Sequence, residues 1–125
     1  MFNKIEDSRT EFKEILNDKL EREVVGFLNS NGGNLYIGIK DNGFIVGIDG
    51  NINKLQLEIK DRIKNNINPT PLGLFDINVN SYDGKNIIHI SIAGGAEKPY
   101  YIKKRGMTQE GCFIRIGNSI EPMHQ

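Results

Sequence analysis

The stretch from Val24 to Ile48 reads VVGFLNSNGGNLYIGIKDNGFIVGI, and the rest of the chain is arranged around it. Its apolar residues begin with a helical period, break at Asn-Ser-Asn-Gly-Gly, and resume with the two-residue alternation of a strand. The turn signal Asp41-Asn42-Gly43 then precedes a second apolar run. This stretch therefore predicts a helix, a tight corner and a β-hairpin over residues 34–46.

Helix signals lie on both sides of this stretch. Asp18 and Glu21 are spaced as a capping box, so the first helix is predicted to begin at Asp18 and to end before the double glycine. A second capping pattern at Asn53 precedes apolar residues at helical spacing, which predicts a helix over residues 54–67. Pro69 should end that helix.

Period-two alternation predicts the remaining strands. One strand over residues 10–16 precedes the first helix, and a hairpin turns at Asp83-Gly84. Short strands follow near residues 100–103 and 112–116. In the last strand the alternation places Cys112, Ile114 and Ile116 inward and Arg115 outward.

These elements predict an α+β fold in which two main helices pack on a mixed, mostly antiparallel sheet of about six strands built from hairpins. The helix over residues 54–67 is expected to be the single long crossover. A length of 125 residues suits one domain, so residues 1–125 are interpreted as a single domain. The aperiodic tail from residue 117 onward suggests the N-terminal part of a longer protein.

The composition limits the functional classes. The formal net charge is zero, with 16 basic and 16 acidic residues, so nucleic-acid binding would require a local basic patch. A single cysteine, Cys112, excludes an internal disulfide and a cysteine-rich zinc site. No apolar run approaches the roughly 20 residues of a membrane span. A reducing cytoplasm is therefore the expected location.

Three acids could carry metal chemistry. Clustered carboxylates hold Mg²⁺ or Mn²⁺ and orient water for hydrolysis. Glu6 and Glu11 share a face of neither a regular helix nor a strand, so they converge only if the chain bends near Ser8. Otherwise each acid has a structural explanation: Asp41 forms a turn, Glu11 faces solvent on a strand, and Glu6 lies in a loop.

Basic and aromatic residues gather in the last third of the chain. Such a mixture suits phosphate contact and base stacking, although a solvated loop with two half-buried tyrosines would look the same. Asn29 and the Gly32-Gly33 pair suit a helix end, His89 lies on a sheet face, and Cys112 is a core residue. The candidate nucleic-acid contacts are Lys13, Lys98, Tyr100, Lys103, Lys104, Arg105 and Arg115.

Six segments form a recognisable series: Glu11-Phe12-Lys13, Val25 to Ser30 with Gly32-Gly33, Leu35 to Gly43, Val46-Gly47, Lys98-Pro99-Tyr100 and Phe113 to Gly117. In order and spacing, over nearly the whole chain, they resemble the schlafen AlbA-like domain family.

The resemblance implies a domain that binds DNA or RNA, often at the N-terminus of bacterial regulator-like or helicase-related proteins. In the schlafen branch it also implies a metal-dependent endoribonuclease with three acids, which fall on Glu6, Glu11 and Asp41. This chain departs from that branch because it lacks a Cys/His zinc cluster and is a single copy. The family's Gly-Ser-Ser is here Gly117-Asn118-Ser119.

Three functional hypotheses follow. The first is a nucleic-acid-binding domain that needs no cofactor, in particular the DNA-binding module of a bacterial regulator-like protein. The second is an endoribonuclease that uses Glu6, Glu11 and Asp41 to bind Mg²⁺ or Mn²⁺, with Lys13 or a patch lysine neutralising phosphate. The third is a homodimerisation or scaffold domain that pairs through exposed strand edges.

Overall fold

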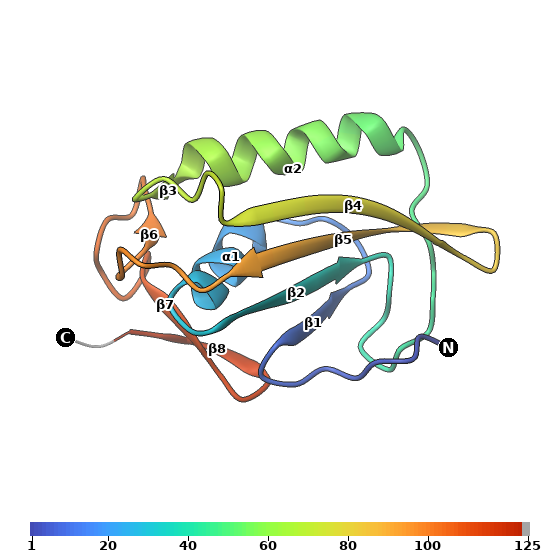
Figure 1. Cartoon of the computed structure of the whole chain (residues 1–125), viewed down its shortest axis with the longest axis horizontal. Coiled ribbons are helices and arrows are strands. Elements are labelled where there is room, and N and C mark those ends of the chain that lie inside the picture. Colours follow the sequence, from blue (N-terminus) through green and yellow to red (C-terminus); the bar gives the residue numbers. More distant parts are fainter. Residues whose placement is uncertain (124–125) are drawn as a thin grey trace.

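The computed structural model describes residues 1–123, which form two helices and eight strands (Figure 1). The α+β class is confirmed, but the strands are divided among three sheets instead of one. In chain order the elements are β1 (Thr10–Lys13), α1 (Leu20–Leu28), β2 (Gly32–Ile37), α2 (Ile52–Asn66), β3 (Ile67–Asn68), β4 (Phe75–Tyr82), β5 (Lys85–Ala93), β6 (Tyr101–Ile102), β7 (Phe113–Ile116) and β8 (Ser119–Pro122).

The central sheet contains four strands in the order β1-β2-β5-β4. β1 and β2 are parallel, whereas β5 pairs antiparallel with both β2 and β4. Parallel neighbours require a crossover, and α1 provides it between β1 and β2. The expectation that α2 would be the single crossover was therefore wrong. Turn residues in the sequence indicate which neighbouring segments pair, but they do not indicate which distant strand lies next to them in the sheet.

The main core lies between the sheet and the two helices. Ile88, Ile90 and Ile92 alternate along β5 onto this face, where they join Phe27 of α1 and Ile63 of α2. A small two-stranded sheet of β3 and β6 closes one end of this core, and a second one of β7 and β8 lies beside α1. Burial of each such side chain stabilises the fold by about 1.5–3 kcal/mol.

The opposite face of the sheet carries a smaller aromatic core. Phe2 from the N-terminal segment packs between three rings, with centroid distances of 5.7 Å to Phe12, 4.8 Å to Tyr36 and 5.2 Å to Tyr82. The first residues of the chain are therefore anchored on the sheet. This anchoring holds Glu6 close to β1.

Asn29 and the two glycines form the corner between α1 and β2. The Asn29 side chain is buried; its Nδ2 donates to Tyr100 O at 2.9 Å and to Phe113 O at 2.7 Å, and its Oδ1 accepts from Tyr100 N at 2.6 Å. A Cβ at Gly33 would collide with the Phe27 ring, and Gly32 has φ +77°. The structural roles expected for these residues are confirmed, because only glycine allows α1 to approach the sheet this closely.

The two-stranded hairpin predicted over residues 34–46 forms only in part. β2 ends at Ile37, and beyond it the two arms meet in one isolated antiparallel bridge between Ile39 and Ile45, next to a hydrogen bond from Lys40 N to Phe44 O. β1 and β5 already occupy both edges of β2, so no edge remains for a second arm. Residues 38–46 instead fold as a compact loop in which Gly38 O accepts hydrogen bonds from Val46 N and Gly47 N, each at 2.9 Å.

Both helices begin differently from their capping patterns. Asp18 does not cap α1, whose N-cap is Lys19 without a side-chain bond, and Asn51 instead of Asn53 caps α2 by accepting from Lys54 N at 3.0 Å. Glu21 instead bonds to α2, because its Oε2 accepts a hydrogen bond from Arg62 Nε at 2.9 Å. This tertiary bond outweighs the local cap, since one carboxylate cannot serve both.

The chain from Phe113 onward forms a hairpin that the sequence did not predict. β7 and β8 pair antiparallel across a turn at residues 117 and 118. The predicted orientation of β7 was also wrong: the Arg115 side chain is 0% exposed, whereas Ile116 is 59% exposed. Packing against the Phe27 ring and the Glu11 carboxylate selects the face that buries Arg115.

The edges of the central sheet are β1 and β4. Glu6 and Arg115 cover the β1 edge by bonding to Phe12 N and Thr10 O. The β4 edge has no neighbouring strand among residues 1–123. A homodimer that pairs through an exposed strand edge would therefore use β4, and this remains a prediction. No helix in the described residues is long and apolar enough to cross a membrane.

We expect Asn29→Ala to destabilise the fold because Tyr100 N and Phe113 O lose the partner they have in Asn29, and Tyr100 O keeps only the weak bond from Cys112 Sγ at 3.5 Å. The loss should be roughly 2–5 kcal/mol in the free energy of unfolding. Asn31→Ala, at an exposed position near the same corner, is the matched control and should change stability by less than about 0.5 kcal/mol. Urea denaturation measures both, and equal stability of the two variants would contradict the role of Asn29.

Candidate functional site

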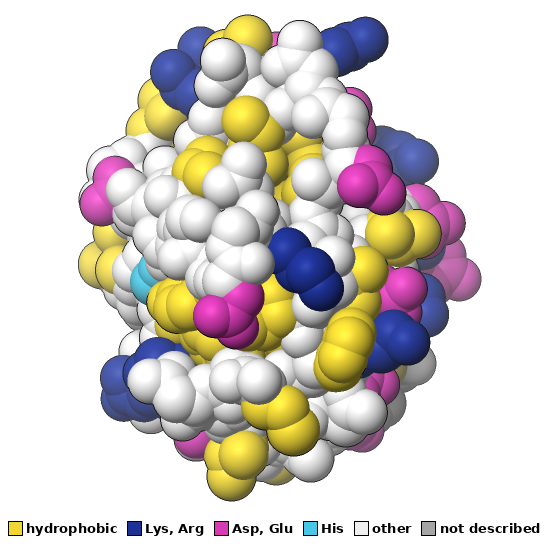
Figure 2. Space-filling model, turned by 90° about the vertical axis from the view of Figure 1, so that its right-hand side faces the viewer, with side chains coloured by type: hydrophobic (Ala, Val, Ile, Leu, Met, Phe, Trp, Pro, Cys, Tyr) yellow, Lys and Arg dark blue, Asp and Glu magenta, His cyan; other side chains and the backbone are white. Residues whose placement is uncertain are grey.

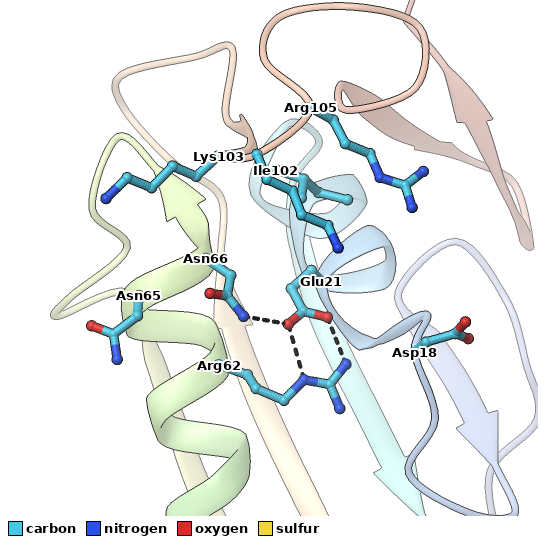
Figure 3. Close-up of a pocket in the computed structure, with 9 residues that line it drawn as sticks. Asp18, Glu21, Arg62, Asn65, Asn66, Ile102, Lys103 and Arg105 are labelled. Atoms are coloured by element: carbon cyan, nitrogen blue, oxygen red, sulfur yellow. Dashed lines mark hydrogen bonds and ion pairs between the residues drawn. The ribbon is translucent and has the colours of Figure 1, made fainter.

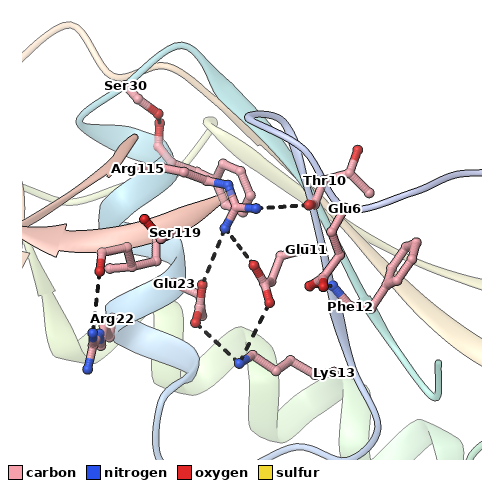
Figure 4. A network of polar contacts seen from close by, with 12 residues as sticks. Glu6, Thr10, Glu11, Phe12, Lys13, Arg22, Glu23, Ser30, Arg115 and Ser119 are labelled. Atoms are coloured by element: carbon pink, nitrogen blue, oxygen red, sulfur yellow. Dashed lines mark hydrogen bonds and ion pairs between the residues drawn. The ribbon is translucent and has the colours of Figure 1, made fainter. Parts of the chain in front are cut away.

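The segment before β1 turns back on that strand and brings Glu6 to its edge. Asp7 N donates to Thr10 O at 3.1 Å, and Thr10 N donates to Asp7 O at 3.4 Å. This turn allows Glu6 Oε2 to accept a hydrogen bond from Phe12 N at 3.1 Å. The bend required for convergence is therefore present, and Glu6 lies beside Glu11 (Figure 4).

The Glu6 carboxyl is influenced by the other two predicted acids. Burial, a hydrogen bond with Glu11 and the negative charges of Glu11 and Asp41 raise the pKa of Glu6 to about 7, against the opposing effect of the Phe12 amide. Like charges in one neighbourhood favour the protonated form of one of them. Near neutral pH, Glu6 therefore exists in both protonation states.

These acids do not form a ready metal site. Within residues 1–123, no three or more His, Cys, Asp or Glu side chains are arranged to hold a metal ion. Glu11 explains this, because its Oε1 lies 2.6 Å from Arg115 Nη1 and its Oε2 lies 3.8 Å from Lys13 Nζ. Two cations of the protein itself thus occupy the carboxylate that a divalent ion would need.

Arg115 connects β7 to the N-terminal segment and β1 (Figure 4). Its Nη2 donates to Asp7 O at 2.6 Å and to Thr10 O at 2.9 Å, and its Nε donates to Asp7 O at 3.2 Å. Its guanidinium also lies 4.9 Å from the centroid of the Phe27 ring. All of these partners are internal, so Arg115 has a structural role and is removed from the predicted phosphate contacts.

Glu23 completes this network, although the sequence analysis did not single it out. Its Oε1 lies 3.3 Å from Lys13 Nζ, and its buried Oε2 lies 3.9 Å from Arg115 Nη1 without a hydrogen-bond partner in the described chain. The helical spacing of Leu20, Glu23 and Phe27 places Glu23 toward the core. This spacing could have identified Glu23 as a buried acid from the sequence.

A basic pocket lies where the loop after β6 meets both helices (Figure 3). Its volume is about 530 Å³. Lys103, Lys104 and Arg105 are exposed and form no ion pair with any residue in the range 1–123. We use the name basic pocket for the space lined by Asp18, Glu21, Arg62, Asn65, Asn66, Ile102, Lys103, Lys104 and Arg105.

Of the two acids that line the basic pocket, Glu21 is neutralised by Arg62, whereas Asp18 is exposed. Glu21 Oε1 accepts from Arg62 Nη2 at 2.6 Å, and its Oε2 accepts from Asn66 Nδ2 at 2.9 Å. Burial acts against ionisation, but hydrogen bonds from Arg62 and Asn66 outweigh it and lower the pKa of Glu21. The charges left for an external ligand are therefore mainly the three cations of the β6 loop.

A protein-family model described as Schlafen, AlbA_2 matches residues 6–124. The chain belongs to this family. No curated protein matches it significantly. The resemblance inferred from the sequence motifs is thus confirmed.

Two solved structures share the fold of this Schlafen, AlbA_2 domain. The DIP2311 protein from Corynebacterium diphtheriae superimposes with a TM-score of 0.67 and 25% identity, covering 93% of this chain and 22% of that protein. The N-terminal domain of a RecG-related protein from Nitrosomonas europaea superimposes with a TM-score of 0.62 and 21% identity, covering 94% of this chain and 82% of that domain. The chain therefore spans about a fifth of the first relative and most of the second domain.

The Glu-Phe-Lys motif of this Schlafen, AlbA_2 domain has a structural explanation. Glu11 and Lys13 belong to the Arg115 network, and Phe12 belongs to the aromatic core. Tyr100, one of the predicted base-stacking residues, is 1% exposed and packs in the main core. Lys98 remains at the surface, where its Nζ donates to Ser30 O at 2.9 Å.

His89 and Cys112 are also explained by packing. The His89 ring stacks on Tyr36 with a centroid distance of 4.5 Å, and its Nε2 lies 2.7 Å from Asn34 Oδ1. Burial and the charge of Lys4 lower the pKa of His89. Burial raises the pKa of the Cys112 thiol, which suits a core residue.

We expect Glu6→Gln to raise the melting temperature at pH 8 and to have less effect at pH 5. The folded protein holds the Glu6 proton up to about pH 7, whereas the unfolded chain releases it near the ordinary value of 4.5, so stability falls as pH rises between these values. Glutamine removes that charge while it retains a donor toward Glu11.

Thermal melts in EDTA measure this effect. Glu14→Gln changes an exposed acid nearby and should show no such pH dependence. A melting-temperature difference for Glu6→Gln that stays constant from pH 5 to pH 8 would contradict the proposed interaction of the three acids.

Proposed function

We propose that this domain binds nucleic acid through the basic pocket and serves as the DNA-binding module of a regulator-like protein. The observation that carries this proposal is the group Lys103, Lys104 and Arg105, three exposed cations without internal ion pairs within residues 1–123. Membership of the Schlafen, AlbA_2 family supports it. Lys98 is a further exposed candidate contact.

The backbone at the basic pocket favours binding by a preformed surface. Arg105 N and Gly106 N both donate to Ile102 O, at 2.9 and 3.0 Å, so the loop makes a tight turn directly after β6. Lys103 N donates to Asn66 O at 2.8 Å and ties the same loop to the end of α2. Cations on an ordered loop lose less conformational entropy when they bind phosphate.

The pocket also has a size that suits part of a nucleic-acid backbone. Small-ligand sites commonly enclose about 300–1,000 Å³, a range that includes this pocket. The exposed Asn65 side chain adds amide groups at the wall, while Arg62 is held on Glu21. Phosphate oxygens would therefore meet the β6-loop cations first, and sugar or base edges would meet the asparagines.

We expect Lys104→Glu and Arg105→Glu to weaken binding to duplex DNA and to flatten its salt dependence. Each lost phosphate contact should reduce the slope of log K against log salt concentration by about 1. Fluorescence anisotropy with duplex DNA, single-stranded DNA and RNA measures this and ranks the ligands. Lys54→Glu, at the other end of α2, is the control with an equal charge change, and unchanged affinity in both pocket variants would refute the pocket as the site.

The endoribonuclease hypothesis has support from the proximity of Glu6, Glu11 and Asp41. The cations that pair with Glu11 weigh against it, because Mg²⁺ or Mn²⁺ would have to displace them. We therefore expect structured RNA to survive equally in Mn²⁺ and in EDTA, as measured by gel electrophoresis of tRNA. Cleavage that requires Mn²⁺ and is lost in Asp41→Ala would reverse this conclusion and establish the nuclease.

A further inference from the structure

Two lysines lie over an exposed aromatic ring at the end of the domain opposite the basic pocket. Phe44 is 51% exposed, and its ring centroid lies 5.8 Å from Lys40 Nζ and 5.5 Å from Lys85 Nζ. Figure 2 faces this end, where hydrophobic side chains gather among basic and acidic ones. The two lysines come from different segments, the loop after β2 and the start of β5.

The loop holds Phe44 outward in a defined position. Phe44 N donates to Asn42 Oδ1 at 3.0 Å, and Phe44 O accepts from Lys40 N at 2.9 Å. Gly43 O accepts from Phe2 N at 2.8 Å, and the next residue, Ile45, is buried in the aromatic core. Because both neighbours are anchored, the ring is presented to solvent by a preformed turn.

We propose that Phe44, Lys40 and Lys85 form a binding site for an unpaired base and the adjoining phosphates of single-stranded nucleic acid. A base stacks on this ring when the lysine over that face turns to an adjoining phosphate. Stacking on aromatic residues contributes about 1–3 kcal/mol per base. Bases in a duplex have their faces covered by their neighbours, so this site selects single strands. It is separate from the basic pocket and does not depend on it.

The two lysines identify the occupant. An exposed phenylalanine alone is common on protein surfaces, and an apolar protein partner covering it would strip water from both lysines without supplying a negative charge. Phosphates on either side of a stacked base neutralise both cations. Lys85 is held in place because its Nζ donates to Ile45 O at 3.3 Å and its stem lies against Gly47.

Tryptophan fluorescence tests this site directly, because the sequence contains no tryptophan. Phe44→Trp places a single fluorophore in the site, and its emission should be quenched by oligothymidylate or oligouridylate of about 12 nucleotides. An oligonucleotide of equal length and charge with abasic residues should leave the emission unchanged. Leu72→Trp, at a position that is 53% exposed, is the matched control and should respond to neither.

Affinity provides the second measurement. Phe44→Leu should weaken binding of the single strand about 5- to 150-fold, the equivalent of one lost stack, with little change for the abasic strand. Lys40→Gln and Lys85→Gln should each reduce the salt slope by about 0.7. Unquenched Phe44→Trp emission at saturation, or unchanged affinity of Phe44→Leu, would overturn this site. Lys104→Glu and Arg105→Glu test the basic pocket independently, so either site can fail alone.

Discussion

The buried guanidinium of Arg115 is the interaction on which the arrangement of this domain depends. It joins segments at opposite ends of the chain, since its partners are the carbonyls of Asp7 and Thr10 and the carboxylate of Glu11. A charge without exposed surface is tolerable only when its donors are satisfied. The folded domain therefore requires each of these partners in its place. Removal of one partner from such a buried pair typically costs about 3–5 kcal/mol.

The same interaction determines what Glu6, Glu11 and Asp41 can do in this protein. Arg115 and Lys13 neutralise Glu11, which leaves Glu6 and Asp41 as the less constrained acids of the cluster. The raised pKa of Glu6 follows first from its burial and then from its position beside the Glu11 carboxylate. The cluster of Glu6, Glu11 and Asp41 thus connects β1 to Arg115 of β7 through Glu11, and among the described residues it is not an open metal site. The surfaces available to ligands lie elsewhere, at the two ends of the domain.

These two surfaces differ in chemistry. The basic pocket presents the cations of the loop after β6, which lies against both helices. These cations suit the phosphate backbone of a nucleic acid of any sequence. The loop after β2 presents the Phe44 ring together with Lys40, and Lys85 at the start of β5 lies over the same ring. This combination suits an unpaired base and its phosphates. Because α2 and the central sheet separate them, the surfaces can contact two parts of one nucleic acid only if it runs along the length of the domain (Figure 1).

The amino-acid pattern alone determined the local elements of this fold. The helical period ending at Asn29, the double glycine and the Asp83-Gly84 turn correctly predicted α1, the corner and the β4–β5 hairpin, since each depends on residues near in sequence. The family resemblance implied a shared site for Glu6, Glu11 and Asp41, and left open whether the chain brings them together. Only the tertiary structure decided that α1 connects two neighbouring parallel strands, that residues 34–46 pair through one isolated bridge instead of a full hairpin, and that Arg115 faces inward. These outcomes depend on which distant strand occupies an edge and which distant carboxylate meets a charge, and neither leaves a periodic signal in the sequence.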